Sequence, residues 1–147
     1  MEITLTEAFA GRDSYTNLTC RWFEDMFTLN SDPVAVAAVI KRPERLPREI
    51  GEKVLIDLVH YDVGRLATAL VDLLAPVMAI QTTYSNKKRE RRSMSKGQMT
   101  PYLHMLTAQI PSTRIEIIVD TGHFPQIDKP TQTNMLLDSF IATLPAG

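Results

Sequence analysis

Two short apolar stretches with a helix signal between them constrain the fold of this chain most. Residues 77–82 and 114–119 are rich in aliphatic and β-branched side chains, which is typical of buried strands. Between them, Thr100-Pro101 predicts a helix start, because a capping hydroxyl followed by proline is a common helix N-terminus. A strand, a helix and a strand in this order predict two parallel strands joined by a right-handed crossover, with helices on both faces. We therefore expect an α/β fold.

The chain before the first of these strands is predicted to be helical. Apolar residues recur at helical spacing from about Ser14 to Phe27, and Ser31-Asp32-Pro33 predicts another helix start. A third helix is expected from Pro47 to about His60, and Asp62 is expected to cap a fourth. The predicted buried stripe of the third helix consists of Ile50, Val54, Leu55 and Leu58. A terminal helix is expected from Pro130 to Leu144.

Composition argues against several classes of function. The 147 residues carry a formal net charge of −1, which provides no long-range attraction to nucleic acid or to anionic membranes. A single cysteine cannot form an internal disulfide, and no cysteine-histidine spacing suggests zinc. The sequence has no signal-peptide pattern and no stretch that could span a bilayer. We expect a cytoplasmic protein with no nucleic-acid or membrane partner.

One histidine follows directly on the second apolar stretch. Gly122-His123 places an imidazole at the end of a predicted strand, and the glycine is expected to let the backbone turn tightly there. A side chain at a strand end is held rigidly, and an imidazole with a near-neutral pKa is the usual general base for activating a hydroxyl. His123 is therefore the leading candidate for a catalytic residue, whereas His60 and His104 lack such a context.

Residues 114–130, Arg-Ile-Glu-Ile-Ile-Val-Asp-Thr-Gly-His-Phe-Pro-Gln-Ile-Asp-Lys-Pro, resemble the carboxy-terminal end of an α/β-hydrolase. In that family the Gly-His after the last strand carries the catalytic histidine, and a proline shortly after it opens the terminal helix. The stretch Ala-Pro-Val-Met-Ala-Ile-Gln at residues 75–81 is similar to the penultimate strand of the family. The resemblance implies a helical cap segment in residues 1–61 and the last βαβα unit of the hydrolase core in residues 62–147.

The resemblance does not extend to the nucleophile. The α/β-hydrolase serine lies in a Gly-x-Ser-x-Gly turn between a strand and a helix, and this sequence contains no such motif. We therefore expect an incomplete domain that is inactive alone, because a base without a nucleophile and an oxyanion hole loses most of its catalytic power. The inner edge of the penultimate strand would then be unpaired, which favours self-association.

The acid of the expected serine-histidine-acid triad is ambiguous. In the family it usually follows the penultimate strand, where this chain has the turn-like Thr-Thr-Tyr-Ser-Asn of residues 82–86. Asn86 is at the usual acid position but is neutral. Asp62 is an alternative acid, because a helix that leads into a parallel strand starts near the carboxyl ends of the strands, although a helix cap is the more common role of such an aspartate. A third alternative is an acid outside this sequence, and Asp120 is close to His123 only along the chain.

The resemblance implies hydrolysis of a small, largely apolar ester, with His123 acting as general base and then as general acid and with no metal or organic cofactor. Trp22, Phe23, Met26 and Phe124 are expected to line the acyl pocket, or else to form ordinary core. Two other functions remain open. One is a non-catalytic interaction module of hydrolase-like fold. The other is nucleic-acid binding by the basic run at residues 87–92, which we expect to be a solvated loop.

Overall fold

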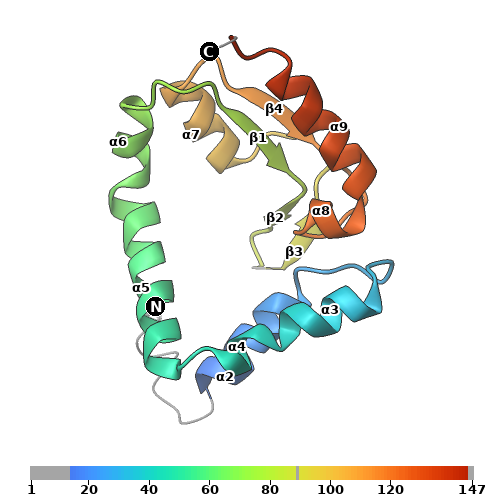
Figure 1. The fold of residues 1–147 in the computed structure, drawn as a ribbon. Coiled ribbons are helices and arrows are strands. Elements are labelled where there is room, and N and C mark those ends of the chain that lie inside the picture. The colour runs from blue at the N-terminus through green and yellow to red at the C-terminus, as the bar shows by residue number, and fades with distance from the viewer. Residues whose placement is uncertain (1–13, 89, 146–147) are drawn as a thin grey trace.

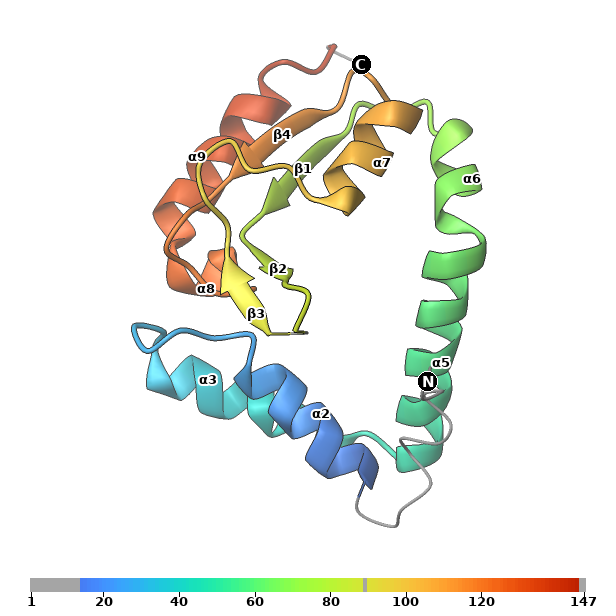
Figure 2. The ribbon, with the colours of Figure 1, turned by 180° about the vertical axis from the view of Figure 1, so that it is seen from behind.

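A computed structural model describes residues 14–88 and 90–145 of the chain. Helices and a small sheet are arranged as a ring around a central opening (Figure 1). Residues 48–71 form one side of the ring, residues 14–45 form its base, and the described residues from 77 to 141 form the rest; the reverse view shows the same arrangement (Figure 2).

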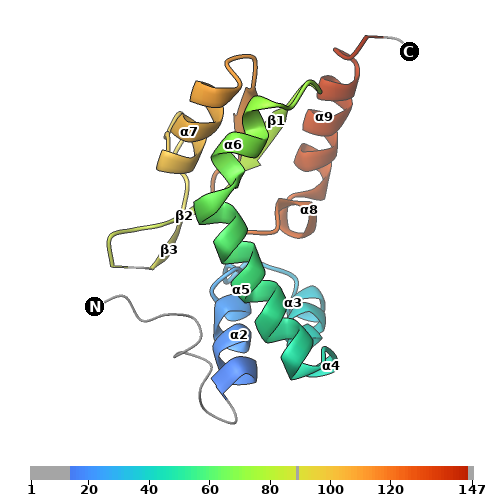
Figure 3. The same ribbon diagram turned by 90° about the vertical axis from the view of Figure 1, so that its left-hand side faces the viewer.

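The predicted strand, helix and strand are present. β1 (Met78–Gln81) pairs in parallel with β4 (Arg114–Ile117), with Met78 opposite Arg114, and α7 (Pro101–Gln109) lies between them in the chain. The Thr100 hydroxyl caps α7 by accepting a hydrogen bond from the Leu103 amide at 3.3 Å. α7 and α9 (Pro130–Ile141) cover opposite faces of the parallel pair (Figure 3). The coarse expectation of an α/β fold is confirmed.

The densest packing lies around this pair of strands. Leu103 and Leu106 of α7, Ile118 just after β4 and Thr121 in the following turn are fully buried. α9 packs on the sheet with only part of its apolar residues, because Met135 and Ile141 are 66% and 60% exposed. The rigid part of the molecule is therefore the part that carries the Gly122-His123 turn.

A hairpin follows β1 where a turn was expected. β2 (Thr83–Ser85) pairs antiparallel with β3 (Arg91–Ser93), so the prediction that residues 82–86 form a turn was wrong, and the basic run is only partly a loop. Asn86 closes the hairpin: its side-chain oxygen accepts from the amides of Lys88 at 2.8 Å and Glu90 at 3.0 Å. These bonds satisfy backbone donors that the turn would otherwise leave unpaired.

The helical region packs around α2 (Ser14–Glu24), which contacts α3 (Pro33–Ile40), α4 (Arg42–Arg45) and α5 (Arg48–Gly64). The predicted start of α3 is confirmed, since the Asp32 side chain accepts from the Val34 amide at 3.0 Å. Residues 1–13, which belong to the predicted cap segment, lie outside the described residues.

Helix α5 differs from its prediction in two ways. It continues through Asp62 to Gly64, so Asp62 does not cap the next helix, α6 (Leu66–Val71), which begins after Arg65. α5 therefore runs through the predicted domain boundary at residues 61 and 62. Three of the four residues of its expected buried stripe are exposed as well: Ile50, Val54 and Leu58 are 53%, 55% and 52% accessible, whereas Leu55 is half-buried. The physical reason is that α5 packs mainly on α2 and α6, and among the described residues no further layer covers its length.

Within the described residues, β1 has β4 as its sole strand partner, so its other edge is unpaired. The described part of the chain also contains no helix that is both long enough and apolar enough to cross a bilayer.

Candidate functional site

The turn after β4 holds His123 in a fixed position. Short α8 (Pro125–Asp128) follows it, and one carboxylate oxygen of Asp128 accepts from the Gly122 amide at 2.7 Å and from the Thr121 hydroxyl at 3.1 Å. Asp120, with φ of 54°, adopts the left-handed conformation in this turn. Gly122 does not, so the expectation that Gly122 provides the conformational freedom of the turn was wrong.

Gly122 is instead needed for close approach. A Cβ atom there would collide with the Met26 carbonyl oxygen and would lie 2.8 Å from the Asp128 carboxylate. The same Met26 oxygen accepts a hydrogen bond from the His123 amide at 2.6 Å. The absence of a side chain at Gly122 thus lets the chain after α2 bond directly to the histidine turn.

The nearest charged neighbour of the His123 ring is a cation. Arg91 of β3 places its Nη1 3.4 Å from His123 Nδ1 and 3.0 Å from the Thr83 hydroxyl. A guanidinium can only donate, so Nδ1 accepts, and the hydrogen of the neutral imidazole lies on Nε2. The sequence did not predict a role for Arg91, because Arg91 belongs to a basic run that was expected to be solvated; in the structure Arg91 is half-buried, whereas Arg92 is exposed.

Burial and the neighbouring charge both lower the pKa of His123. Partial burial of the imidazole, and secondly the Arg91 guanidinium, lower the pKa of His123 below its ordinary value, so the ring is neutral at pH 7. Burial also lowers the pKa of Arg91, against the opposing charge of Asp25, but an arginine stays protonated at physiological pH. No carboxylate of the described residues forms an ion pair with Arg91.

A cavity of about 660 Å³ opens in front of His123. The carboxyl end of β1 and the hairpin form one wall, and Asp62 of α5 and Tyr102 of α7 also line it. The structure thus brings Asp62 and His123 to the same cavity, although no hydrogen bond joins them. The reason first given for Asp62, its place at a helix start, was wrong.

Two smaller cavities lie nearby, and the first of them shares Ser85 and Arg91 with the cavity in front of His123. One of about 250 Å³ is lined by Trp22, Asp25, Met26, Ser85 and Arg91. The other, of about 220 Å³, lies between α2 and α5 and is mostly apolar, with Trp22, Phe23 and Met26 in its wall. Three of the four expected pocket residues therefore line cavities.

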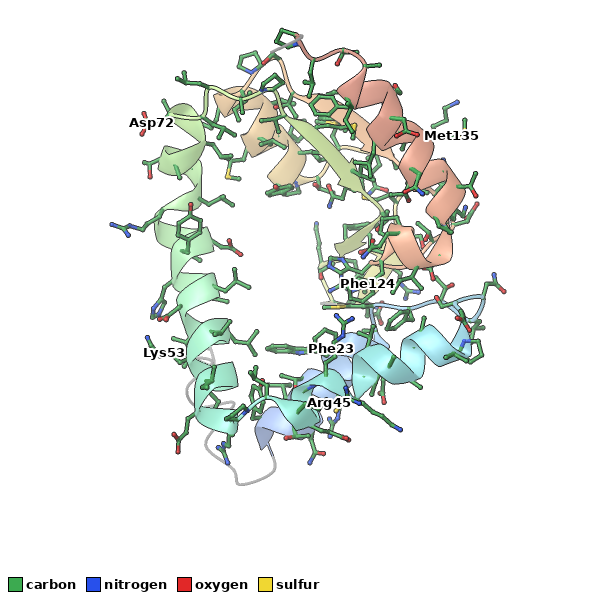
Figure 4. All side chains as sticks on the ribbon, viewed as in Figure 1. Phe23, Arg45, Lys53, Asp72, Phe124 and Met135 are labelled. Carbon is green, nitrogen blue, oxygen red and sulfur yellow. The ribbon has the colours of Figure 1, made fainter. Side chains whose placement is uncertain are left out.

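The fourth, Phe124, packs against Phe27, with the two ring centroids 5.2 Å apart. Figure 4 places Phe23 among the helices of the base and Phe124 beside α8.

The remaining candidates lie elsewhere. The Asn86 amide donates to the Glu90 carboxylate at 2.9 Å within the hairpin turn, so Asn86 is a turn residue and the group beside His123 Nδ1 is Arg91. Arg92 pairs with Glu90 at 2.7 Å, which breaks up the basic run. The described residues contain no group of three or more His, Cys, Asp or Glu side chains that could hold a metal ion.

Comparisons of this chain with protein-family models, with curated proteins and with solved structures find no match.

Proposed function

We propose that this chain supplies the general-base histidine and the cover of an α/β-hydrolase-like site that cleaves small esters. The observation that carries the proposal is the position of His123, at the carboxyl end of a parallel strand pair and beside a cavity of about 660 Å³. Ligands of open α/β sheets bind at the carboxyl ends of the strands. A neutral imidazole is also the form that accepts a proton.

The nucleophile in this proposal comes from polypeptide beyond the 147 residues, since the sequence contains no Gly-x-Ser-x-Gly turn. His123 takes the serine proton as the hydroxyl attacks the ester carbonyl, and returns a proton to the leaving alcohol. Asp62 is the described carboxylate on the same cavity and is the candidate acid. The chain alone is expected to be inactive.

One observation favours a second function, a non-catalytic binding module. A triad histidine donates from Nδ1 to its acid and accepts at Nε2, but here Nδ1 accepts from Arg91. A base acting through Nε2 would require the other tautomer and a displacement of Arg91. The binding module requires neither change.

Hydrolysis of p-nitrophenyl acetate and butyrate distinguishes the two functions. We would assay the chain and a version extended upstream in its reading frame, each with His123→Ala and with His104→Ala, a matched control at an exposed position of α7. Activity in the extended protein alone, lost with His123→Ala and kept with His104→Ala, is the expected result. The rate should fall as the pH drops through the lowered pKa of His123, because the protonated ring cannot act as a base.

Two other outcomes would reject the proposal. An extended protein that has no nucleophile turn and hydrolyses neither ester would favour the binding module. Activity of the 147-residue chain itself that survives His123→Ala would show that the histidine is not the base.

A further inference from the structure

Arg91 is a half-buried cation that forms no ion pair with any carboxylate of the described residues, and Asp25 compensates its charge only from a greater distance. Its Nη1 has two neutral acceptors, Thr83 and His123, and its Nε is buried without a hydrogen-bond partner. Placing a guanidinium in a partly buried site costs free energy unless an anion or several acceptors compensate it. A side chain in this state, on the wall of an open cavity, indicates a missing anionic partner.

We propose that Arg91 and His123 bind the carboxylate of a small molecule whose apolar tail extends toward Trp22 and Met26. The binding itself does not depend on catalysis. The statement that this molecule is the substrate or product of the site does rest on the proposed function.

The position of Arg91 suits a carboxylate. Arg91 lines both the cavity in front of His123 and the smaller cavity beside α2, and Ser85 lines both as well. A planar guanidinium matches the two oxygens of a carboxylate, and a serine hydroxyl or a ring N–H can donate to the same group. Arg91 is held in place from β3 by its bond to Thr83, so the binding geometry is largely formed in advance.

The other charges near the site favour a monoanion. Asp25 lies in the smaller cavity and Asp62 in the larger, and both repel an incoming anion. Neither is ion-paired with Arg91. A ligand with one negative charge meets less repulsion than a phosphate ester with two, so we assign the site to a monocarboxylate.

The apolar tail of the ligand is inferred from the side chains that line the cavity beside α2. The cavity beside α2 shares Trp22 and Met26 with the apolar cavity between α2 and α5. Arg91 and the two apolar side chains thus form a continuous wall that changes from cationic to apolar. A straight-chain or aromatic monocarboxylate of a few carbons matches that change.

The test is a titration of the histidine rings by NMR with hexanoate and with hexanamide, its neutral isostere, in chloride-free buffer. Hexanoate should raise the pKa of His123 by on the order of half a unit or more, because a bound anion offsets the Arg91 charge. Hexanamide should have no such effect, and His60 and His104 serve as internal controls. Equal effects of the two compounds would overturn the proposal without any variant.

Variants of Arg91 and of its neighbour Arg92 test whether the response to hexanoate depends on Arg91. Arg91→Gln should abolish the response to hexanoate and raise the resting pKa of His123, whereas Arg92→Gln, at an exposed position of the same strand, should leave both unchanged. A response that persists in Arg91→Gln, or disappears equally in Arg92→Gln, contradicts the assignment. Acetate should bind at least tenfold more weakly than hexanoate, since each buried methylene contributes about fourfold; equal affinity would reject the apolar tail.

The outcome is separable from that of the ester assay. Carboxylate binding to Arg91 in a protein that hydrolyses no ester supports this inference and rejects the hydrolase. Ester hydrolysis that depends on His123, with no response to hexanoate, supports the hydrolase and rejects this inference.

Discussion

At the scale of single residues, Gly122 shows why one small side chain is required beside the candidate base. The need arises from two segments far apart in the sequence, because the Met26 carbonyl oxygen and the Asp128 carboxylate both lie within 3 Å of the position that a Cβ at Gly122 would occupy. Main-chain atoms of a packed turn cannot rotate out of the way as the end of a flexible side chain can. A methyl group at this position must therefore displace the backbone.

Gly122→Ala should consequently reduce the free energy of unfolding by about 2–3 kcal/mol, as expected for overpacking against backbone. Gly64→Ala is the matched control. A Cβ at Gly64, the last residue of α5, meets nothing within 4 Å, so alanine should be neutral or stabilise by up to about 1 kcal/mol through its higher helix propensity. Urea unfolding followed by circular dichroism measures both. Equal stability of the two variants would contradict the close approach.

At the scale of elements, the hairpin of β2 and β3 connects a turn residue to the electrostatics of His123. Asn86 makes three side-chain bonds that close the turn, to the amides of Lys88 and Glu90 and to the Glu90 carboxylate. β3 in turn carries Arg91 to the histidine. Weakening the turn should therefore increase the motion of the Arg91 guanidinium.

Asn86→Ala is expected to destabilise the protein by about 1 kcal/mol or somewhat more, given the typical contribution of such bonds. It should also raise the pKa of His123, because Arg91 would spend less time beside the ring. Lys88→Ala is the control in the same turn, since Lys88 contributes its backbone amide and its side chain is exposed. Thermal unfolding and histidine NMR measure the two effects. An unchanged pKa of His123 in Asn86→Ala would show that the hairpin turn does not affect the site.

The elements that sequence predicts correctly are those with local signals. Asp32-Pro33 and Thr100-Pro101 each place a capping side chain next to a proline, and both helices begin there. The hairpin has no such signal, because its turn lacks glycine and its charged residues resemble a solvated loop. The prediction that Asp62 caps a helix was wrong for a related reason. No residue just before Gly64 ends a helix, so α5 continues through Asp62.

The candidate site was predictable only in part. His123 follows from the order of strand, glycine and histidine, which is local. Its contact with Arg91 spans 32 positions and depends on the pairing of β3 with β2, which the sequence did not predict. The apolar spacing of α5 likewise predicts a helix, but whether that face is buried depends on a second layer that spacing cannot reveal.

At the scale of the whole molecule, the free edge of β1 is the feature that bears on association. The Arg114 amide donates to the Val77 carbonyl and the Ile118 amide to the Gln81 carbonyl, at 3.0 and 3.3 Å. Because strand residues alternate in the direction of their main-chain groups, Ala79 also faces β4, whereas Ile80 faces the unpaired edge. An unpaired edge favours the addition of another strand.

We predict concentration-dependent self-association of the chain through this edge, visible by size-exclusion chromatography with light scattering. Ile80→Pro should weaken it, because proline removes an edge amide and spares the bonds to β4. Ala79→Pro, one residue away, should instead destabilise the fold by breaking the pairing with β4. Undiminished association of a folded Ile80→Pro protein would locate the contact elsewhere, and the exposed side of α5 would be the next surface to test.

The bond between the His123 amide and the Met26 carbonyl has a mechanical consequence. The base of the ring is joined to the sheet side both by the chain through α5 and α6 and by this bond at the opposite end. This bond and the neighbouring contact between Phe27 and Phe124 oppose a movement that would separate the base from the sheet. Molecules should therefore exchange with the cavity through its open sides, and a movement that lifts α2 away from the sheet would pull on the backbone of the histidine itself.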